Sequence, residues 1–389
     1  MTHVFALKRF ALFNSFTGGF FIKTKTTKIL AFLVTGYAAT AIAPQSWAES
    51  KTRPELNAEV GLSGYLAYAA LNNSVLEAAF NRWQAALEKV NQAKYLPNPK
   101  LRYAYFIEEV ETRVGPQKQK FGLSQTFPWF GTLRLRGNVA LKAANAAHEQ
   151  YQTEKLQLFY EVKKIYYEYY YLYQTINITK DNITLLKHLE SVAQSKYKAG
   201  SSVSGVIKAQ IELSELNDRL RSLRDLRGPV MAQFNAILNA PLHQLVPWPT
   251  KPPFTEITGS EHRLSNVLKE NNPELKRLEN IIAKEEASEG LARKQSYPHF
   301  TLGVDYIDTE EALTLTPDSG KDPLVAMISI DLPLWRSKYR DAVEEAQNRR
   351  EAVIETYINR GNVLEANLKM ALYQLHEAER KKSVFLEIP

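Results

Sequence analysis

The 389-residue sequence contains no cysteine. Disulfides, thiolate metal sites, a cysteine nucleophile and a lipid on an N-terminal cysteine are therefore excluded. After residue 48 the sequence also lacks an apolar stretch long enough for a transmembrane helix. If the mature chain enters a membrane, it must do so with β-strands, because only helices and closed barrels satisfy the backbone in lipid.

Acidic residues are absent from the first 48 positions, which hold five Lys and Arg. These precede an apolar run from Ile29 to Ala43, and Ser46-Trp47-Ala48 fits a small-x-small cleavage site. The pattern predicts a signal peptide over residues 1–48, with an N-terminal membrane anchor as the alternative. Removing these five charges lowers the formal net charge from +7 to +2, so we expect no nucleic-acid partner.

Motifs of catalysis and metal binding are few. We find no phosphate-binding loop, nucleophile triad or paired-carboxylate signature, and the seven histidines lack ligand spacing. We therefore expect no enzyme activity, no cofactor and no metal site. The tyrosine cluster between Tyr166 and Tyr173 is expected to pack against other helices rather than bind a ligand.

An internal repeat organises the chain. Residues 121–131 and 326–335 each form an alternating strand that ends at a proline and leads into a long polar helix. Residues 99–105 and 298–306 each form a strand that precedes them. The sequence thus predicts a helix–strand–strand–helix unit used twice. We expect Pro128, Gly131 and Pro333 to shape the turns from strand to helix.

Alternation divides the strand residues between two faces. One face is apolar, with aromatic residues near its ends, and the other is small, polar or charged. This is typical of strands between lipid and a lumen, although a soluble sheet packed on a core alternates in the same way. The charged positions that could line a pore are Arg102, His299, Asp305 and Asp331. Four strands cannot close a barrel, whereas three chains would supply twelve.

The remaining sequence predicts very long helices. Residues 135–198 contain no Pro and no Gly other than Gly137, and the turn at 199–202 ends this stretch. The return helix carries Leu213, Leu216, Leu220 and Leu223 at coiled-coil spacing. Gly228-Pro229 should kink or interrupt this helix.

The proline spacing sets the domain boundaries. After the signal peptide, residues 49–240 form the first repeat, 241–260 a Pro-rich linker, and 261–389 a second repeat. Relative to the first repeat, the second lacks a counterpart of the glycine turn and return helix. We therefore expect a chain that is incomplete at its C-terminus.

Four motifs in this order carry a family resemblance. They are Asn98-Pro99-Lys-Leu101, Ser124–Gly131, Tyr197-Lys-Ala-Gly200 and Asn272-Pro273-Glu-Leu275. With them the chain resembles the TolC-like outer-membrane efflux proteins, especially the branch that serves heavy-metal and multidrug pumps. The sequence departs from the family at Thr132, where Lys is common.

The resemblance implies a mainly α fold with a small β part. Two hairpins per chain join a shared barrel of a homotrimer in outer-membrane lipid of a Gram-negative bacterium, and coiled-coil-like helices form a tunnel through the periplasm. It also implies a passive conduit for metal ions or drugs, with a periplasmic adaptor and an inner-membrane pump as partners. The adaptor would dock at Tyr197, Gly200, Ser201 and Ser202. The alternative is a soluble periplasmic coiled-coil adaptor or structural protein.

Overall fold

The computed structural model describes residues 61–252, 257, 259–314 and 316–386. The signal peptide predicted over residues 1–48 lies outside this range. Within it, the first repeat contains the helices α1 (Leu62–Asn72), α2 (Ser74–Ala93), α3 (Thr132–Lys198) and α4 (Ser204–Leu238). The second contains α5 (Glu261–Asn271), α6 (Pro273–Lys294) and α7 (Arg336–Leu386). The long helices and the breaks between them follow the predicted order.

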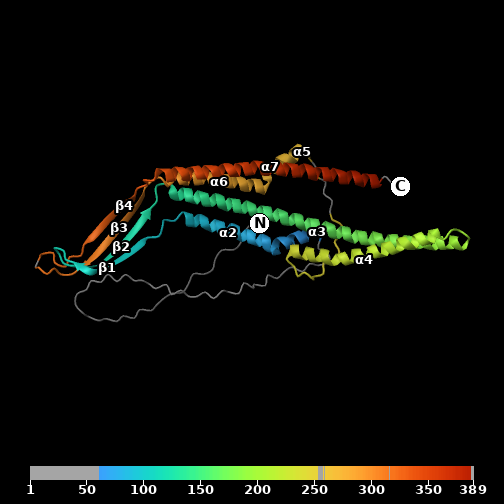
Figure 1. Ribbon diagram of the computed structural model, residues 1–389, viewed down its shortest axis with the longest axis horizontal. Helices are drawn as coiled ribbons and strands as arrows, with labels where there is room; N and C mark the ends of the chain where they lie inside the picture. The colour runs from blue at the N-terminus through green and yellow to red at the C-terminus, as the bar shows by residue number, and fades with distance from the viewer. Residues whose placement is uncertain (1–60, 253–256, 258, 315, 387–389) are drawn as a thin grey trace, which may run out of the picture. The chain divides into compact units, whose positions relative to one another are not determined.

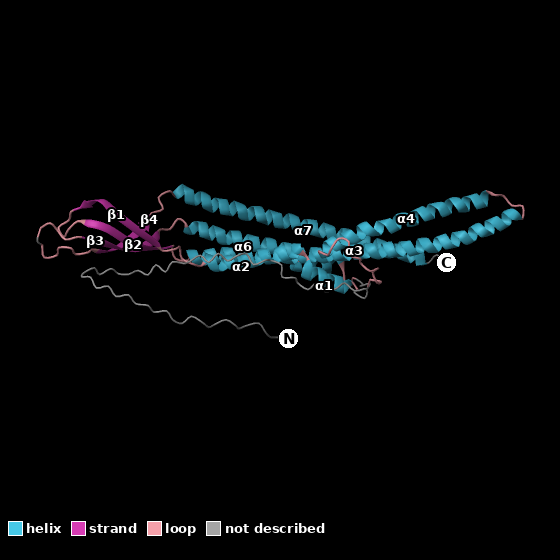
Figure 2. Cartoon of the chain, turned by 90° about the horizontal axis from the view of Figure 1, so that it is seen from below, coloured by secondary structure: helices cyan, strands magenta, loops and turns pink. Residues whose placement is uncertain are grey.

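Four antiparallel strands form one sheet in the order β1-β2-β3-β4. They are β1 (Lys100–Val110), β2 (Gln117–Phe127), β3 (His299–Thr309) and β4 (Leu324–Asp331). The two predicted hairpins are thus confirmed, and β2 and β3 join them into a single sheet. Figures 1 and 2 show this sheet at one end of the helices.

Helix α6 begins as its sequence predicts. Pro273 occupies the first helical turn, where its missing N–H is not needed. The side chain of Asn272 accepts hydrogen bonds from the backbone N–H groups of Glu274 (2.9 Å) and Leu275 (3.3 Å). These bonds satisfy donors that have no partner inside the helix.

The main core lies where α1, α3, α4 and the linker meet. Tyr166 and Tyr169 are fully buried there, which confirms the packing role expected for this part of the tyrosine cluster. Their hydroxyl groups donate to the backbone oxygens of Thr250 (2.9 Å) and Val246 (2.9 Å) in the linker. Burial raises the pKa of Tyr169. The linker has no regular structure where it is described, but these bonds fix it to α3.

A kink or an interruption was expected at Gly228-Pro229, and helix α4 is continuous through Pro229, so the interruption is wrong. A proline inside a helix removes one hydrogen bond and crowds the preceding turn. Long-range packing against α3 offsets this cost along most of α4. The leucine seam is part of that packing, because Leu213 and Leu220 are buried and Leu216 and Leu223 lie against the same core.

Candidate functional site

The sheet exposes its apolar face. Leu101, Tyr103, Leu123 and Ile328 are 77%, 58%, 53% and 72% exposed. The strand pairing places Leu101 opposite Leu123 and Leu302 opposite Ile328, so these side chains form continuous apolar rows. A soluble sheet would cover such a face with its core. In the described part of the chain, no helix covers it.

The apolar rows end at polar positions on the loop side. On this face Gln119 pairs with Asp308, one row beyond the pair Phe121 and Tyr306. Strand β4 advances seven residues from Leu324 to Asp331, about 24 Å along its length, whereas β1, β2 and β3 are 11 residues long. The 11-residue strands have the length of tilted strands that cross an outer membrane, about 9–11 residues.

The reverse face of the sheet is polar and partly buried. Asp305 is 7% exposed, and Lys120 of β2 forms an ion pair with it at 2.6 Å. Gly122 leaves the space that the Asp305 carboxylate occupies, because a Cβ at Gly122 would collide with Oδ1. This face is therefore ordered by charge pairing across strands rather than by apolar packing.

The four predicted pore positions share this polar face. His299 pairs with Asp331 between β3 and β4, and Arg102 and Asp305 both lie opposite Gly122 on either side of β2. Arg102 and Asp331 are exposed, His299 is half-buried, and Asp305 is buried beside its lysine. Their role in lining a pore stays a prediction.

The turns from strand to helix differ between the repeats. Gly131 precedes α3 with a φ of 81°, a left-handed conformation that favours glycine. The corresponding position in the second repeat is Arg336, already part of α7. Before that helix, the N–H of Leu334 donates to the oxygen of Leu332 at 3.0 Å, directly after Pro333. Pro128 and Pro333 therefore both stand at turns from strand to helix, but the backbone conformation of the two turns differs.

The two hairpin loops interlock, which the sequence does not reveal. The N–H of Gly320 donates to the oxygen of Val114 (2.7 Å), and the N–H of Glu310 donates to the oxygen of Pro116 (2.9 Å). Gly115 lies so close to the backbone of Glu310 that a side chain at this glycine would collide with it. The loops thus form one unit at the end of the sheet away from the helices.

The tip between α3 and α4 is exposed. Gly200 has a φ of 97°, which confirms the left-handed turn, and its N–H donates to the oxygen of Tyr197 at 2.9 Å. Ser201 and Ser202 are exposed, and Tyr197 is 52% exposed. The hydroxyl of Ser202 accepts from the N–H of Ser204 at 3.3 Å, at the start of α4. This tip presents its side chains to solvent, as a docking element must.

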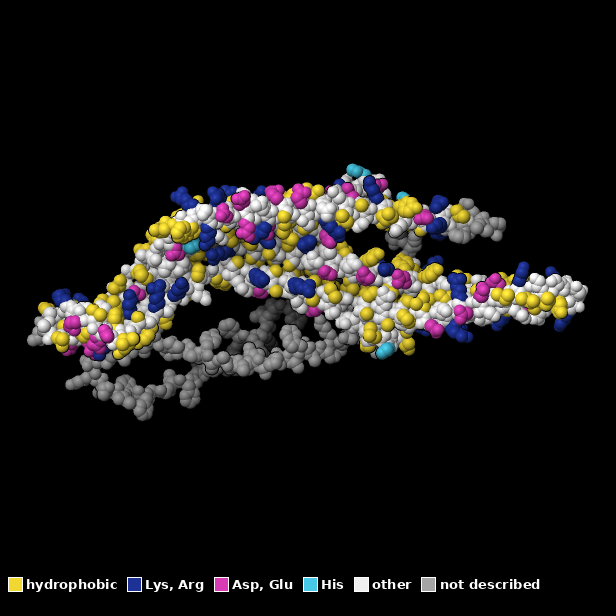
Figure 3. Space-filling model, viewed as in Figure 1, with side chains coloured by type: hydrophobic (Ala, Val, Ile, Leu, Met, Phe, Trp, Pro, Cys, Tyr) yellow, Lys and Arg dark blue, Asp and Glu magenta, His cyan; other side chains and the backbone are white. Residues whose placement is uncertain are grey.

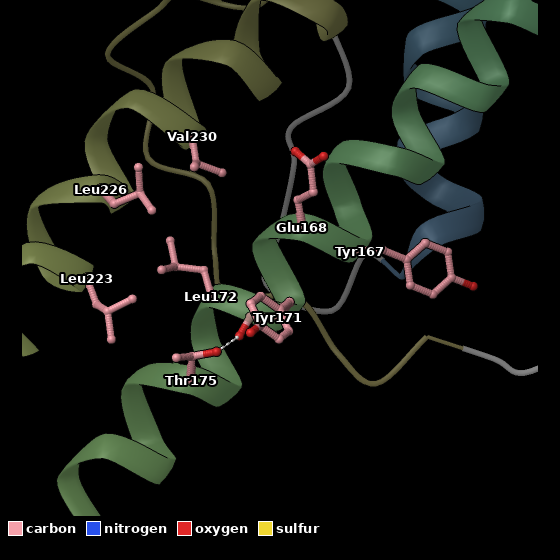
Figure 4. Close-up of a pocket in the computed structure, with 8 residues that line it drawn as sticks. All are labelled: Tyr167, Glu168, Tyr171, Leu172, Thr175, Leu223, Leu226 and Val230. Atoms are coloured by element: carbon pink, nitrogen blue, oxygen red, sulfur yellow. Dashed lines mark hydrogen bonds between the residues drawn. The ribbon is translucent and has the colours of Figure 1, made fainter. Parts of the chain in front are cut away.

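A shallow groove of about 460 Å³ lies between α3 and α4. Figure 4 shows Leu172 of α3 directed toward Leu223, Leu226 and Val230 of α4. Tyr171 at its edge is 71% exposed. Most of the lining surface is apolar, and its polar groups come from Glu168, Thr175 and the two tyrosines of α3.

The pair α6 and α7 is held by charges, unlike the leucine-rich pair α3 and α4. Glu289 of α6 accepts hydrogen bonds from Gln347 (2.9 Å) and Arg350 (3.1 Å) of α7, and from Arg293 (2.7 Å) of its own helix. These contacts, that of Arg293 first, hold the pKa of Glu289 below its ordinary value. Glu285 of α6 likewise pairs with α7.

Two further features are absent from the described residues. No helix in those ranges is long and apolar enough to cross a membrane. No group of three or more His, Asp or Glu side chains there could hold a metal ion.

Part of the sequence matches a known protein family. Residues 66–242 match the family described as outer membrane efflux protein. This segment spans most of the first repeat, including β1, β2, the long helix α3 and the tip. The resemblance to the TolC-like outer membrane efflux proteins, predicted from the motifs, is confirmed. A comparison with curated protein sequences found no match.

Solved structures share the fold. The outer-membrane channel OprN matches with a TM-score of 0.65 and 16% identity over 84% of this chain and 75% of that chain. CusC, solved in work on transmembrane channel formation, matches with a TM-score of 0.64 and 15% identity over 84% of this chain and 80% of that chain. The outer membrane protein VceC from Vibrio cholerae matches with a TM-score of 0.61 and 16% identity over 83% of this chain and 79% of that chain. The predicted fold class, mainly α with a small β part, is therefore confirmed.

Proposed function

We propose that this chain is one subunit of a trimeric outer-membrane efflux channel. Three copies of the sheet would form a twelve-stranded barrel, and the helices of the two repeats, 49–240 and 261–389 with the linker 241–260, would form a tunnel in the periplasm. The family match supports an efflux channel component. The channel would act as a passive conduit, with polar side chains along its wall.

The single observation that carries this proposal is that the sheet exposes its apolar face and partly buries its polar face. Its apolar rows are exposed, whereas the buried residues of the sheet, such as Ser124 and Asp305, lie on the polar face. Leaving so many apolar side chains in water is unfavourable at about 25 cal/mol per Å². Lipid on the apolar side and water on the polar side remove this penalty.

The edge strands support assembly from several chains. In the order β1-β2-β3-β4, both β1 and β4 have one side without a strand partner in the described chain. They are 11 and 8 residues long, and both are largely exposed. Such open edges cannot persist in lipid, since every backbone group there must be paired. Pairing β1 of one copy with β4 of the next satisfies both edges.

The partners and the cargo belong to the same proposal. The exposed tip at Tyr197, Gly200, Ser201 and Ser202 would dock a periplasmic adaptor, and an inner-membrane pump would supply energy. The exported substrate would be metal ions or drugs. Because the wall offers no metal-binding cluster among the described residues, substrate choice would be made mainly by the pump.

The absence of cysteine makes the assembly directly testable. Ala104→Cys on the polar face of β1 is combined in turn with Val325→Cys, Met327→Cys and Ser329→Cys on the same face of β4. Oxidation of detergent-extracted outer membranes should yield covalent dimers and trimers for at least one pair, without reducing agent. The single variants are matched controls, because one cysteine per chain cannot link three chains.

A different result would refute the proposal. If the chain is recovered as a soluble periplasmic monomer, or if no pair forms covalent trimers, the shared barrel is wrong. Recovery in the soluble fraction would instead favour the coiled-coil adaptor, the alternative considered from sequence.

A further inference from the structure

The end of the sheet that faces the helices is basic. Residues 94–100, 128–136, 292–299 and 332–340 contain no acidic residue. In the antiparallel sheet all four of these connections lie at the same end of the strands, because Phe127 pairs with Phe300 and Phe300 with Ile330. Neighbouring strands are about 5 Å apart, so the ends of β2 and β4, which lead into α3 and α7, are separated by roughly 10 Å at the sheet. Their charges therefore act as one surface.

Five residues at these two helix starts define what we term the basic girdle. They are Arg134, Arg136, Arg336, Lys338 and Arg340. Four are exposed and Arg136 is half-buried. Neither α3 nor α7 has an acidic residue in its first turn, where a carboxylate would ordinarily be favourable. The positive end of each helix dipole thus adds to the side-chain charge.

The girdle has little compensation from within the chain. In the described ranges, no ion pair involves Arg134, Arg136 or Arg336, and Arg340 contacts only its neighbour Asp341, at 3.5 Å. Asp331 and Asp341 lie beside these positions, but the five positive charges outnumber them and repel one another. An external anion would relieve that repulsion.

Aromatic and apolar side chains connect the girdle to the exposed face of the sheet. Phe130 and Trp335 are 81% and 74% exposed and directly precede the basic helix starts. Trp129 stacks on Tyr297 (5.2 Å) and Phe300 (5.7 Å) beside them. Figure 3 shows hydrophobic and dark blue side chains adjoining where the sheet meets α7. Exposed aromatic residues at the end of an apolar band are typical of a membrane–water interface.

The opposite end of the sheet has the opposite charge. In residues 108–118 and 308–322, acidic residues outnumber basic residues eight to three. Lys118 is one of the three, and it is already paired with Glu109 and Glu310. A general surplus of lysine and arginine therefore does not explain the girdle, because the charge changes sign across the apolar band.

From this arrangement we propose that the basic girdle binds the anionic headgroups of phospholipids in the periplasmic leaflet. The inference rests on the proposed function, since it requires the apolar band to lie in lipid. The phosphate of phosphatidylglycerol would sit against the arginines, with its acyl chains beside Phe130 and Trp335. Guanidinium groups suit this ligand because they bind phosphate oxygens through two parallel hydrogen bonds.

Trp129 and Trp335 make the proposal measurable. The full chain is reconstituted into phosphatidylcholine vesicles, and its tryptophan fluorescence is quenched with brominated phosphatidylcholine or brominated phosphatidylglycerol. The ratio of the two quenching curves gives the relative binding of the anionic lipid near these residues. Trp335→Phe should remove much of the quenching, which verifies the reporter.

The test variant is Arg134→Gln/Arg336→Gln/Lys338→Gln. The matched control, Lys208→Gln/Arg219→Gln/Arg221→Gln, removes three exposed charges from α4, far along the chain from the sheet. We expect the wild type and the control to prefer phosphatidylglycerol at least about fivefold at low salt, and the test variant to show a ratio close to one. The preference of the wild type should fall as salt is raised.

The outcomes separate the two proposals. Quenching by both lipids with equal strength in the wild type would overturn the headgroup site while leaving the barrel intact. An equal preference in the wild type and the test variant would overturn the role of these three residues, and with it the girdle. If brominated lipid of neither kind quenches, the sheet is not in the bilayer and the proposed function itself fails.

Discussion

Gly122 of β2 and Asp305 of β3 lie directly opposite each other, and the missing side chain of the glycine holds the carboxylate of the aspartate. Lys120, two residues earlier on β2, completes the arrangement with an ion pair of 2.6 Å. The polar face of the sheet is therefore packed around one buried charge pair, and its stability should depend on all three residues.

Gly122→Val should displace the Asp305 carboxylate from Lys120. A valine at this position fills the space of Oδ1, so either the aspartate rotates away or the two strands separate. We expect a loss of about 1–3 kcal/mol in the free energy of unfolding, measured in detergent. Ala104→Val on the edge strand β1 is the control and should change stability by less than about 0.5 kcal/mol. Equal effects of the two substitutions would show that the glycine is not required.

Lys120→Met should be more harmful than Asp305→Asn. Removing the lysine leaves a carboxylate that is 7% exposed without its counter-charge, whereas removing the acid leaves a lysine that can reach water. We expect the free energy of unfolding to fall by about 1–3 kcal/mol for Lys120→Met and by less than about 1 kcal/mol for Asp305→Asn. The double variant should recover part of the loss of Lys120→Met. Denaturant unfolding of the four proteins in one detergent measures the coupling, and strict additivity would contradict the pair.

The charged pairing of α6 and α7 should make that contact sensitive to acid. The pKa of Glu289 is lowered, mainly by the hydrogen bond from Arg293, and that of Glu365 is lowered, mainly by Lys269 of α5. A lowered folded-state pKa stabilises the fold above the unfolded value of about 4.3. That contribution is lost as the pH falls through the folded value.

Glu289→Gln therefore should lower the melting temperature at pH 7, where Arg293 and Arg350 lose their shared counter-charge. The difference from the wild type should shrink as the pH falls below about 4.3 and should vanish only below the lowered folded-state pKa of Glu289, where the wild-type carboxyl is also neutral. Glu88→Gln, at an exposed position of α2, is the control for the loss of one carboxylate and should change the melting temperature at pH 7 much less than Glu289→Gln does. A difference that stays constant with pH would mean that Glu289 acts by shape rather than by charge.

Sequence reasoning found those elements whose signals are local. The proline-bounded strands, the left-handed Gly200 and the Asn272-Pro273 helix start each depend on a few neighbouring residues. Helix α1 was not predicted from the sequence, because the stretch from Leu62 to Leu71 is apolar on most sides and lacks a clear polar face. Its burial against α3 and α4 is a tertiary effect.

Contacts between distant segments could not be predicted in this way. Glu289 and Arg350 are 61 positions apart, and helical periodicity does not state which helices will be neighbours. Asp305 was expected on a polar, pore-facing surface, but its burial depends on the register that places it beside Gly122. The faces of the strands followed from alternation, whereas the packing within a face required the structure.

The tip between α3 and α4 offers a matched pair of glycines for the last prediction. Gly200 has a φ of 97° and open space around it, so Gly200→Ala would meet no atom but would strain the backbone. Gly205 lies within α4, where alanine is favoured over glycine by about 1 kcal/mol. Its new Cβ would rest in ordinary contact with Ala193, at 3.9 Å. We expect Gly200→Ala to destabilise by about 1 kcal/mol, whereas Gly205→Ala, at the second residue of α4, should be neutral or stabilise by less than about 1 kcal/mol. If the tip docks the adaptor through its turn, Gly200→Ala should also weaken adaptor binding in pull-down from detergent, whereas Gly205→Ala should not. Equal binding of both variants would remove the turn from the docking surface.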